Sequence, residues 1–183
     1  MCSINGYVDY SGGRTSPEGQ VRTAGETMRR RGPDGHGIHV SEGVAFYHNR
    51  LAVMDPEGGK QPMSVSVGER RYTVVYNGEL YNSAELRREL SAKGAVFKTS
   101  CDTETVLWSY IVWGQECPAR FNGIFAFAVC EEGADKVFFA RDRLGVKPFF
   151  YAVRGSRFFF ASEIKALLSH PEIPPEVDKV ELW

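Results

Sequence analysis

The architecture is set by four short runs rich in phenylalanine and valine: IFAFAV (124–129), VFFA (137–140), FFYA (149–152) and FFFA (158–161). Each run has the length and composition of a β-strand, and the intervals of about ten residues predict an antiparallel meander. Apolar residues stand at consecutive positions in several of these runs, whereas a strand with one wet face alternates apolar and polar residues. We therefore expect their sheet to be covered on both faces, by helices or by a second sheet.

Further strands and a helix are expected before this region. Short apolar runs bounded by glycine-rich or polar turns predict strands at residues 3–10, 38–40, 44–47 and 72–76. Ser16 followed by Pro17 is typical of a helix start. That first helix should end in the arginine run 29–31, because the Gly-Pro pair that follows cannot continue a helix.

Three more helices are predicted from their end signals. The second begins at Asn82, where Glu85 completes a capping box, and stops at Gly94. The third is capped by Asp102 or Thr103 and ends at Gly114. A short fourth helix starts at Ser162 and stops before Pro171. We expect the second and third helices to be neighbours.

Composition excludes several classes of function. The 183 residues include 22 Lys and Arg against 23 Asp and Glu, a formal net charge of -1, which gives no electrostatic basis for binding nucleic acid or an anionic membrane. No stretch approaches the roughly 18 to 20 apolar residues of a spanning helix, and the start lacks signal-peptide features, so a cytoplasmic protein is expected. The sparse cysteines at 2, 101, 117 and 130 indicate reduced thiols and no disulfide framework.

Cys2 has the sharpest chemical signature, because it directly follows the initiator methionine. Removal of Met1 would expose a cysteine that carries its own α-amino group. An α-amine titrates near roughly 7.7 to 8.0 and a thiol near roughly 8.5, so one residue would hold a nucleophile and a base matched to neutral pH. Taken alone, a cysteine at the second position is more often a chance residue.

Three further positions carry groups suited to an amide substrate. Asn77-Gly78 closes an apolar strand, where a side-chain amide and a backbone N–H can form an oxyanion hole; the alternative is a simple Asn-Gly turn. Arg50 follows a strand and is either a carboxylate ligand or a surface arginine. Asp102 is either a plain helix cap or a cap whose free oxygen binds an ammonium group.

These residues belong to motifs that run in order over nearly the whole chain: MCSI (1–4), RGPDG (31–35), HNRL (48–51), YNGELYN (76–82), DTE (102–104), FNGIFAF (121–127), RDRLG (141–145) and ASEIKAL (161–167). Together the motifs resemble the glutaminase domain of the class II glutamine amidotransferases, and more narrowly that of the glutamine-hydrolysing asparagine synthetases. The resemblance implies an α+β fold of the N-terminal-nucleophile hydrolase type, a four-layer αββα sandwich of two antiparallel sheets flanked by helices. Residues 1–170 would form this domain and residues 171–183 a connector to an absent ATP-dependent synthetase domain.

The resemblance also implies site residues. The nucleophile falls on Cys2, and the oxyanion hole on the Asn77 side chain and the Gly78 backbone. Arg50 would bind the substrate carboxylate and Asp102 its α-ammonium group. The same pocket would be lined by Glu79 and by the chain after Arg50, namely Leu51, Val53 and Met54.

The implied activity is hydrolysis of the glutamine side-chain amide to glutamate and ammonia, with aspartate as the favoured ammonia acceptor. No metal or cofactor is expected in this domain, and ATP and Mg would bind only in the synthetase domain. Partners would be glutamine and that domain, with no nucleic acid or membrane; a homodimer stays open. Two alternatives remain: an amidotransferase domain for another acceptor, or a catalytically silent binding or regulatory module.

Two other motifs suggest different chemistry. SGGRTS (11–16) approximates the phosphate loop of ATP enzymes that release pyrophosphate, but Thr15 stands at the acidic position, so a glycine-rich turn is the favoured interpretation. His36 and His39 invite a metal hypothesis. Because they are three apart in a strand region, their side chains should point to opposite faces, which argues against a shared ion.

Overall fold

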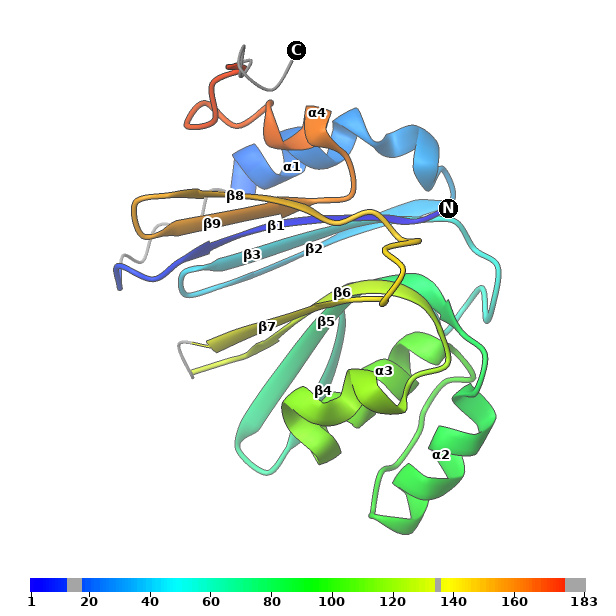
Figure 1. The fold of residues 1–183 in the computed structure, drawn as a ribbon. Helices are drawn as coiled ribbons and strands as arrows, with labels where there is room; N and C mark the ends of the chain where they lie inside the picture. The colour runs from blue at the N-terminus through cyan, green and yellow to red at the C-terminus, as the bar shows by residue number, and fades with distance from the viewer. Residues whose placement is uncertain (13–17, 134–135, 177–183) are drawn as a thin grey trace.

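The computed structural model describes residues 1–12, 18–133 and 136–176 (Figure 1). Sheet A consists, in spatial order, of β2 (Gly35–Ser41), β3 (Val44–Arg50), β1 (Ser3–Asp9), β9 (Arg157–Ala161) and β8 (Phe150–Arg154). Sheet B consists, in spatial order, of β4 (Met63–Val67), β5 (Arg70–Leu80), β6 (Gly123–Glu131) and β7 (Lys136–Arg141). All the strand pairs are antiparallel.

The helices lie on the outer faces of the two stacked sheets. They are α1 (Glu18–Thr27), α2 (Ser83–Ala92), α3 (Asp102–Trp113) and α4 (Ile164–Leu167), with 3-10 turns η1 (Arg29–Arg31) and η2 (Gly114–Arg120). Figure 1 shows α1 and α4 over sheet A, and α2 and α3, which pack on each other, over sheet B. The predicted four-layer sandwich is therefore confirmed. None of the helices in the described ranges is long and apolar enough to cross a membrane.

The apolar runs reflect burial on both faces of each strand. In β6, bulky side chains face the helices and small ones face sheet A; the first set is Phe125, Phe127 and Val129, and the second Ala126, Ala128 and Cys130. Large residues fill the space under α3, whereas the close approach of two sheets leaves room for small ones. The expectation of a doubly covered sheet is confirmed, with a helical layer on one side and a second sheet on the other.

The single meander predicted for the last third of the chain is wrong. Runs 124–129 and 137–140 pair as β6 and β7 in sheet B, whereas runs 149–152 and 158–161 pair as β8 and β9 in sheet A. The chain between β7 and β8 crosses from one sheet to the other, and β9 then pairs with β1 at the other end of the sequence. This long-range pairing leaves no mark in the local pattern.

Three predicted side-chain caps do not form, because each side chain bonds elsewhere in the fold, although Asn82 does occupy the N-cap position of α2. Asn82 precedes α2, but its amide contacts the backbone of Arg120 and Asn122. Asp102 lies inside α3, after Cys101, and its carboxylate bonds to sheet B. The Ser162 hydroxyl accepts the backbone N–H of Ile4, 3.0 Å away, and α4 begins two residues later. The predicted helix stops at Gly94 and Gly114 are confirmed, with φ of 94° and 59°.

Three other regions bear on the predictions. The glycine loop 11–16 lies largely outside the described residues, as do Ser16 and Pro17. His36 stacks on Tyr47 and His39 packs near Phe46, so the two histidines do point to opposite faces. Beyond residue 170, Ile173 is buried in the core under α1 and α4.

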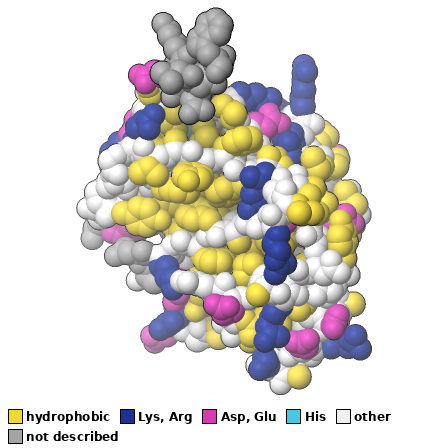
Figure 2. Space-filling model, in the orientation of Figure 1, with side chains coloured by type: hydrophobic (Ala, Val, Ile, Leu, Met, Phe, Trp, Pro, Cys, Tyr) yellow, Lys and Arg dark blue, Asp and Glu magenta, His cyan; other side chains and the backbone are white. Residues whose placement is uncertain are grey.

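The outer edge of sheet A exposes hydrophobic side chains. Figure 2 shows them gathered over β8 and β9. In β8, Tyr151 and Val153 are more than half exposed.

Candidate active site

A cavity of about 180 Å³ lies at one end of the sandwich, between the two sheets and the start of α3. Its lining includes every site residue that the sequence predicts: Cys2, Arg50, Leu51, Val53, Met54, Asn77, Gly78, Glu79 and Asp102. These positions come from the residue before β1, the end of β3 with the loop after it, β5 and the start of α3. The fold thus brings four distant stretches of sequence to one pocket.

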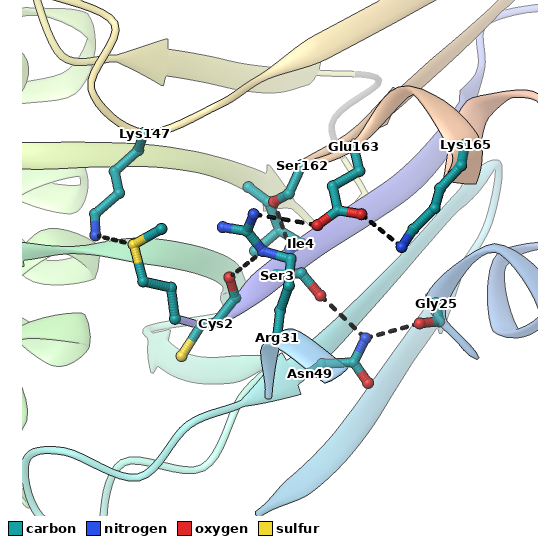
Figure 3. A network of polar contacts seen from close by, with 11 residues as sticks. Cys2, Ser3, Ile4, Gly25, Arg31, Asn49, Lys147, Ser162, Glu163 and Lys165 are labelled. Carbon is teal, nitrogen blue, oxygen red and sulfur yellow. Dashed lines mark hydrogen bonds and ion pairs between the residues drawn. The ribbon is translucent and has the colours of Figure 1, made fainter. Parts of the chain in front are cut away.

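The start of β1 is fixed by contacts from three directions, as Figure 3 shows. Arg31 donates its Nε–H to the Cys2 carbonyl at 3.1 Å, and Arg31 itself pairs with Glu163 at 3.3 Å. Asn49 donates to the Ser3 hydroxyl at 3.0 Å and to the Gly25 carbonyl at 2.8 Å. These bonds hold the Cys2 backbone in place while its side chain stays at the cavity wall.

The Cys2 sulfur lies against the loop that follows β3. The Leu51 backbone N–H donates to Cys2 Sγ at 3.3 Å, and the Leu51 carbonyl lies 3.6 Å from the same atom. These contacts hold the sulfur beside the loop at the cavity wall. Burial raises the pKa of Cys101, and it raises the pKa values of Cys117 and Cys130 to about 12.

The Asn77 side chain supplies an unpaired donor. Asn77 lies inside β5 and pairs with Ala126 in β6, which excludes the Asn-Gly turn. It is only 2% exposed, and among the described residues nothing accepts a hydrogen bond from its Nδ2. A buried unsatisfied amide is costly in a folded protein, and such groups in a pocket are suited to a ligand.

The Gly78 backbone N–H has the same character, as the bonding of its neighbours shows. The Tyr76 N–H donates to Gln61 Oε1 at 2.6 Å, and the Leu80 N–H to Asp102 Oδ2 at 3.1 Å. Amides two residues apart point to the same side of a strand, so the Gly78 N–H points away from β6, between these two acceptors. Asn77 and Gly78 thus present two donors to the cavity.

Arg50 is held by the loop that it precedes. Its Nη1 and Nη2 donate to the carbonyls of Pro56 and Asp55 at 2.6 and 2.7 Å. The Asp55 carboxylate in turn accepts from Gly58 and Ser100, and hydrogen bonds from Ser100 and Gly58 lower its pKa. A guanidinium has five N–H donors, so Arg50 retains donors for a carboxylate.

Asp102 presents one carboxylate oxygen to sheet B and leaves the other at the cavity. Its Oδ2 accepts from the Tyr76 hydroxyl at 2.8 Å and from the Leu80 N–H at 3.1 Å. Burial and the neighbouring carboxylate raise the pKa of Tyr76 well above its ordinary value, so the phenol stays protonated as a donor. The contact of Oδ1 is the weak Cys101 thiol at 3.7 Å, which leaves this oxygen suited to an ammonium group.

Several cavity residues were not predicted: Met1, Gly59, Gln61, Tyr76, Cys101, Thr103 and Lys147. Gln61 bridges the two halves of the wall, because its amide accepts from the Tyr76 N–H and donates to the Tyr76 carbonyl and the Thr103 hydroxyl, both at 3.1 Å. Tyr76 stands within the quoted YNGELYN motif, so its position was a usable signal. The sequence around Gln61 carried no such signal, since Gln61 lies in an irregular loop. The described residues hold no group of three or more His, Cys, Asp or Glu side chains placed to bind a metal ion.

Comparison with known proteins gives a consistent result. A family profile described as a glutamine amidotransferase domain matches residues 1–183. The chain is 48% identical over 182 residues to asparagine synthetase [glutamine-hydrolyzing] 3 of Bacillus subtilis, and 34% identical over 204 residues to a putative asparagine synthetase [glutamine-hydrolyzing] 2 of Methanocaldococcus jannaschii. Each alignment spans 100% of this chain but only 30% and 39% of the relative.

A solved structure supports the fold. The glutamine phosphoribosylpyrophosphate amidotransferase of B. subtilis superposes with a TM-score of 0.75 at 21% identity, over 91% of this chain and 43% of that one. The similarity therefore concerns the architecture of two sheets between helical layers.

Proposed function

The chain belongs to the glutamine amidotransferase domain family, and from that premise we propose that its pocket hydrolyses the side-chain amide of glutamine, with Cys2 as the nucleophile. The observation that carries this proposal is the unpaired donor Asn77 Nδ2, next to the Gly78 N–H that points away from β6, in the same cavity as the Cys2 thiol. A thiol and two converging donors are the groups that acyl transfer requires.

The charges of the cavity suit the two charged groups on the α-carbon of a free amino acid. Arg50 would bind the α-carboxylate, and Asp102 Oδ1 the α-ammonium group. These contacts orient the side-chain amide toward Cys2. A cavity of about 180 Å³ accommodates a small molecule of this size class and not a polymer.

The reaction proceeds in two halves. After removal of Met1, the α-amine of Cys2 takes the thiol proton, and the sulfur attacks the amide carbon to give a tetrahedral oxyanion bound by Asn77 and Gly78. The amine returns the proton to the leaving nitrogen, and the C–N bond breaks to release ammonia. Water then attacks the γ-glutamyl thioester with the amine as base, which releases glutamate and restores the thiol.

The fate of the ammonia is a further part of the proposal. The chain spans about a third of the length of the asparagine synthetases it resembles. We infer that residues 1–170 form the glutaminase unit and that residues 171–183 lead toward an ATP-dependent synthetase domain. That domain would hold the ATP and Mg and would transfer the ammonia to aspartate, in the cytoplasm.

The test is intact mass measured before and after incubation with 6-diazo-5-oxo-norleucine, an electrophilic glutamine analogue. The expected result is loss of Met1 and one adduct, which Cys2→Ala abolishes and Cys101→Ala retains. Cys101 is the matched control because it lines the same cavity with a thiol whose pKa is raised by burial. Loss of Met1 without an adduct, or an adduct that survives Cys2→Ala, would contradict the proposal.

A further inference from the structure

Lys147 is a buried cation in the wall of the cavity. It is 7% exposed and lies in the segment between β7 and β8. Its Nζ lies 3.2 Å from the sulfur of Met1, and Figure 3 shows the side chain reaching toward the start of the chain. Among the described residues, no carboxylate lies within ion-pair distance of this ammonium group. A buried charge with a thioether as its polar contact is unusual, because burial of an unpaired ion is costly.

The backbone around Lys147 is rigidly held. The Asp142 carboxylate accepts the N–H groups of Val146 and Lys147, both at 2.9 Å, and that of Phe125 at 3.2 Å. Burial opposes ionisation of Asp142, but these backbone hydrogen bonds outweigh it and lower the pKa of Asp142. Arg141 donates to the Lys147 carbonyl at 2.7 Å. The loop is therefore built to hold Lys147 in one place.

Met1 is the residue whose removal the proposed function requires. Its sulfur contacts Lys147, and its carbonyl carbon is bonded to the Cys2 nitrogen, so Met1 links the two groups. Removal of Met1 deletes the thioether and frees the Cys2 amine in the same step.

Other titratable or charged groups line the same cavity or contact the Cys2 backbone. They are the Cys2 thiol, Arg31 from η1, Arg50 from β3, Tyr76 and Glu79 from β5, Cys101 just before α3, and Asp102 from α3. Arg31 and Arg50 are already bonded to backbone carbonyls. Asp102 is bonded to Tyr76 and Leu80, and Glu79 is exposed at the rim. Among the described residues of this set, Lys147 is the cation whose side chain is not bonded to a backbone carbonyl.

We propose that Lys147 is a positioning residue for the nucleophile: once Met1 is removed, its ammonium group lies beside the Cys2 amine and keeps that amine in the neutral form that accepts the thiol proton. A like charge disfavours protonation of the amine, and the same charge stabilises the neighbouring thiolate. This role rests on the proposed function, and it specifies how the base stays available at neutral pH.

The test measures the amine directly, without catalysis. The chain lacking Met1 is treated with trace acetic anhydride across a pH series, and mass spectrometry of the N-terminal peptide gives the titration midpoint of the α-amine. The midpoint in the folded wild type should lie below that of the same chain unfolded in urea. Lys147→Gln should raise the folded midpoint by about one pH unit, and Lys147→Arg should restore it because the charge is kept.

Two further variants control for folding and for net charge. Lys147→Met keeps the length of the side chain and should raise the midpoint as Lys147→Gln does. Lys136→Gln removes one exposed lysine at the far end of β7 and should leave the midpoint unchanged. The acid limb of the pH profile of kcat/KM for glutamine should move to higher pH, as the titration midpoint of the amine does, in the Lys147→Gln and Lys147→Met variants only.

The outcomes separate this inference from the proposed function. Equal midpoints in the folded and unfolded wild type, or a shift in Lys147→Arg equal to that in Lys147→Gln, would overturn the role of Lys147. Absence of glutamine hydrolysis in the wild type would overturn the proposed function, while the acetylation midpoint would still decide whether Lys147 acts on the amine.

Discussion

At the scale of single residues, Asn77 illustrates how the fold prepares a donor and leaves it free. Its amide is buried in β5 and unpaired among the described residues. Loss of one oxyanion donor typically costs about 2.7 to 4 kcal/mol in the transition state. Asn77→Ala should therefore lower kcat for glutamine hydrolysis by about 10²- to 10³-fold, as measured by steady-state glutamate release. The exposed Asn122→Ala serves as control, and an unchanged kcat in Asn77→Ala would refute the oxyanion assignment.

Arg50 should affect substrate binding instead of turnover. The contact proposed between Arg50 and the substrate carboxylate would exist in the ground state and the transition state alike, so its loss should raise KM more than it lowers kcat. Lysine lacks the planar fork of donors with which arginine can bind a carboxylate at two points while it holds the loop carbonyls. Arg50→Lys should raise KM for glutamine by about tenfold or more. A fall in kcat at constant KM would assign Arg50 to the chemical step.

His48 makes the stability of the chain depend on pH. It is fully buried in β3, and burial lowers its pKa to about 3, whereas an unfolded histidine titrates near about 6.5. The unfolded state therefore binds the extra proton as the pH falls below about 6.5, and stability falls by about 1.4 kcal/mol per pH unit down to about pH 3.

The measurement is urea unfolding at pH 7 and pH 5. The free energy of unfolding should fall by about 2 kcal/mol less in His48→Leu than in the wild type between these two values. The difference cancels the contributions of other histidines and carboxylates. Equal pH dependence in the two proteins would contradict the prediction.

Sequence reasoning at this scale found residues that share one cavity where polar groups were concentrated in motifs. Cys2, Arg50, Asn77 and Asp102 were predicted because each is a polar or charged residue or a thiol in a recognisable stretch. Lys147 was missed because its significance depends on burial and on Met1, which is distant in sequence. The prediction that Asp102 caps the helix was wrong for the same reason, because its hydrogen-bond partners lie in β5.

At the scale of elements, α1 lies so close to sheet A that one glycine is required. A Cβ on Gly25 would lie 2.3 Å from two ring atoms of the buried Tyr47, whereas a Cβ on Gly19 in the same helix would meet nothing within 4 Å. Gly25→Ala should cost about 1 to 3 kcal/mol through overpacking. Gly19→Ala should instead stabilise by about 0.5 kcal/mol, since alanine favours a helix. Thermal unfolding of both variants gives the comparison. Equal changes in Tm would show that α1 shifts away from Tyr47 and relieves the clash.

The sequence predicted most of the segments that form strands, but not which of these strands pair with one another. The run 124–129 indicated burial on both faces, and the alternation of phenylalanine with alanine explains it. Nothing in runs 137–140 and 149–152 shows that they belong to different sheets. That assignment depends on β9 pairing with β1, whose register joins Asn5 to Ala161. The short strand β4 was missed, although MSVSV alternates apolar and polar residues as a strand with one exposed face does.

At the scale of the whole molecule, the site depends on the spacing between the two sheets. Cys2 and Arg50 come from sheet A, whereas Asn77 and Gly78 come from sheet B. The attacking sulfur and the oxyanion donors therefore keep their relative positions only while the layer between the sheets keeps its thickness. That layer is formed by small and aromatic side chains: Ile4, Phe46, Val75, Ala126, Ala128, Cys130 and Phe160.

A matched pair of substitutions tests this dependence. Ala128 lies between the sheets and Ala24 lies between α1 and sheet A; both are fully buried. Leucine at either position should cost about 1 to 3 kcal/mol, measured by urea unfolding. Only Ala128→Leu should also lower kcat/KM of the folded protein, by about 10- to 100-fold, because a displacement near 1 Å misaligns the reacting groups. Since α1 contributes no residue to the cavity, equal losses of activity in the two variants would show that overall stability, and not sheet spacing, limits the site.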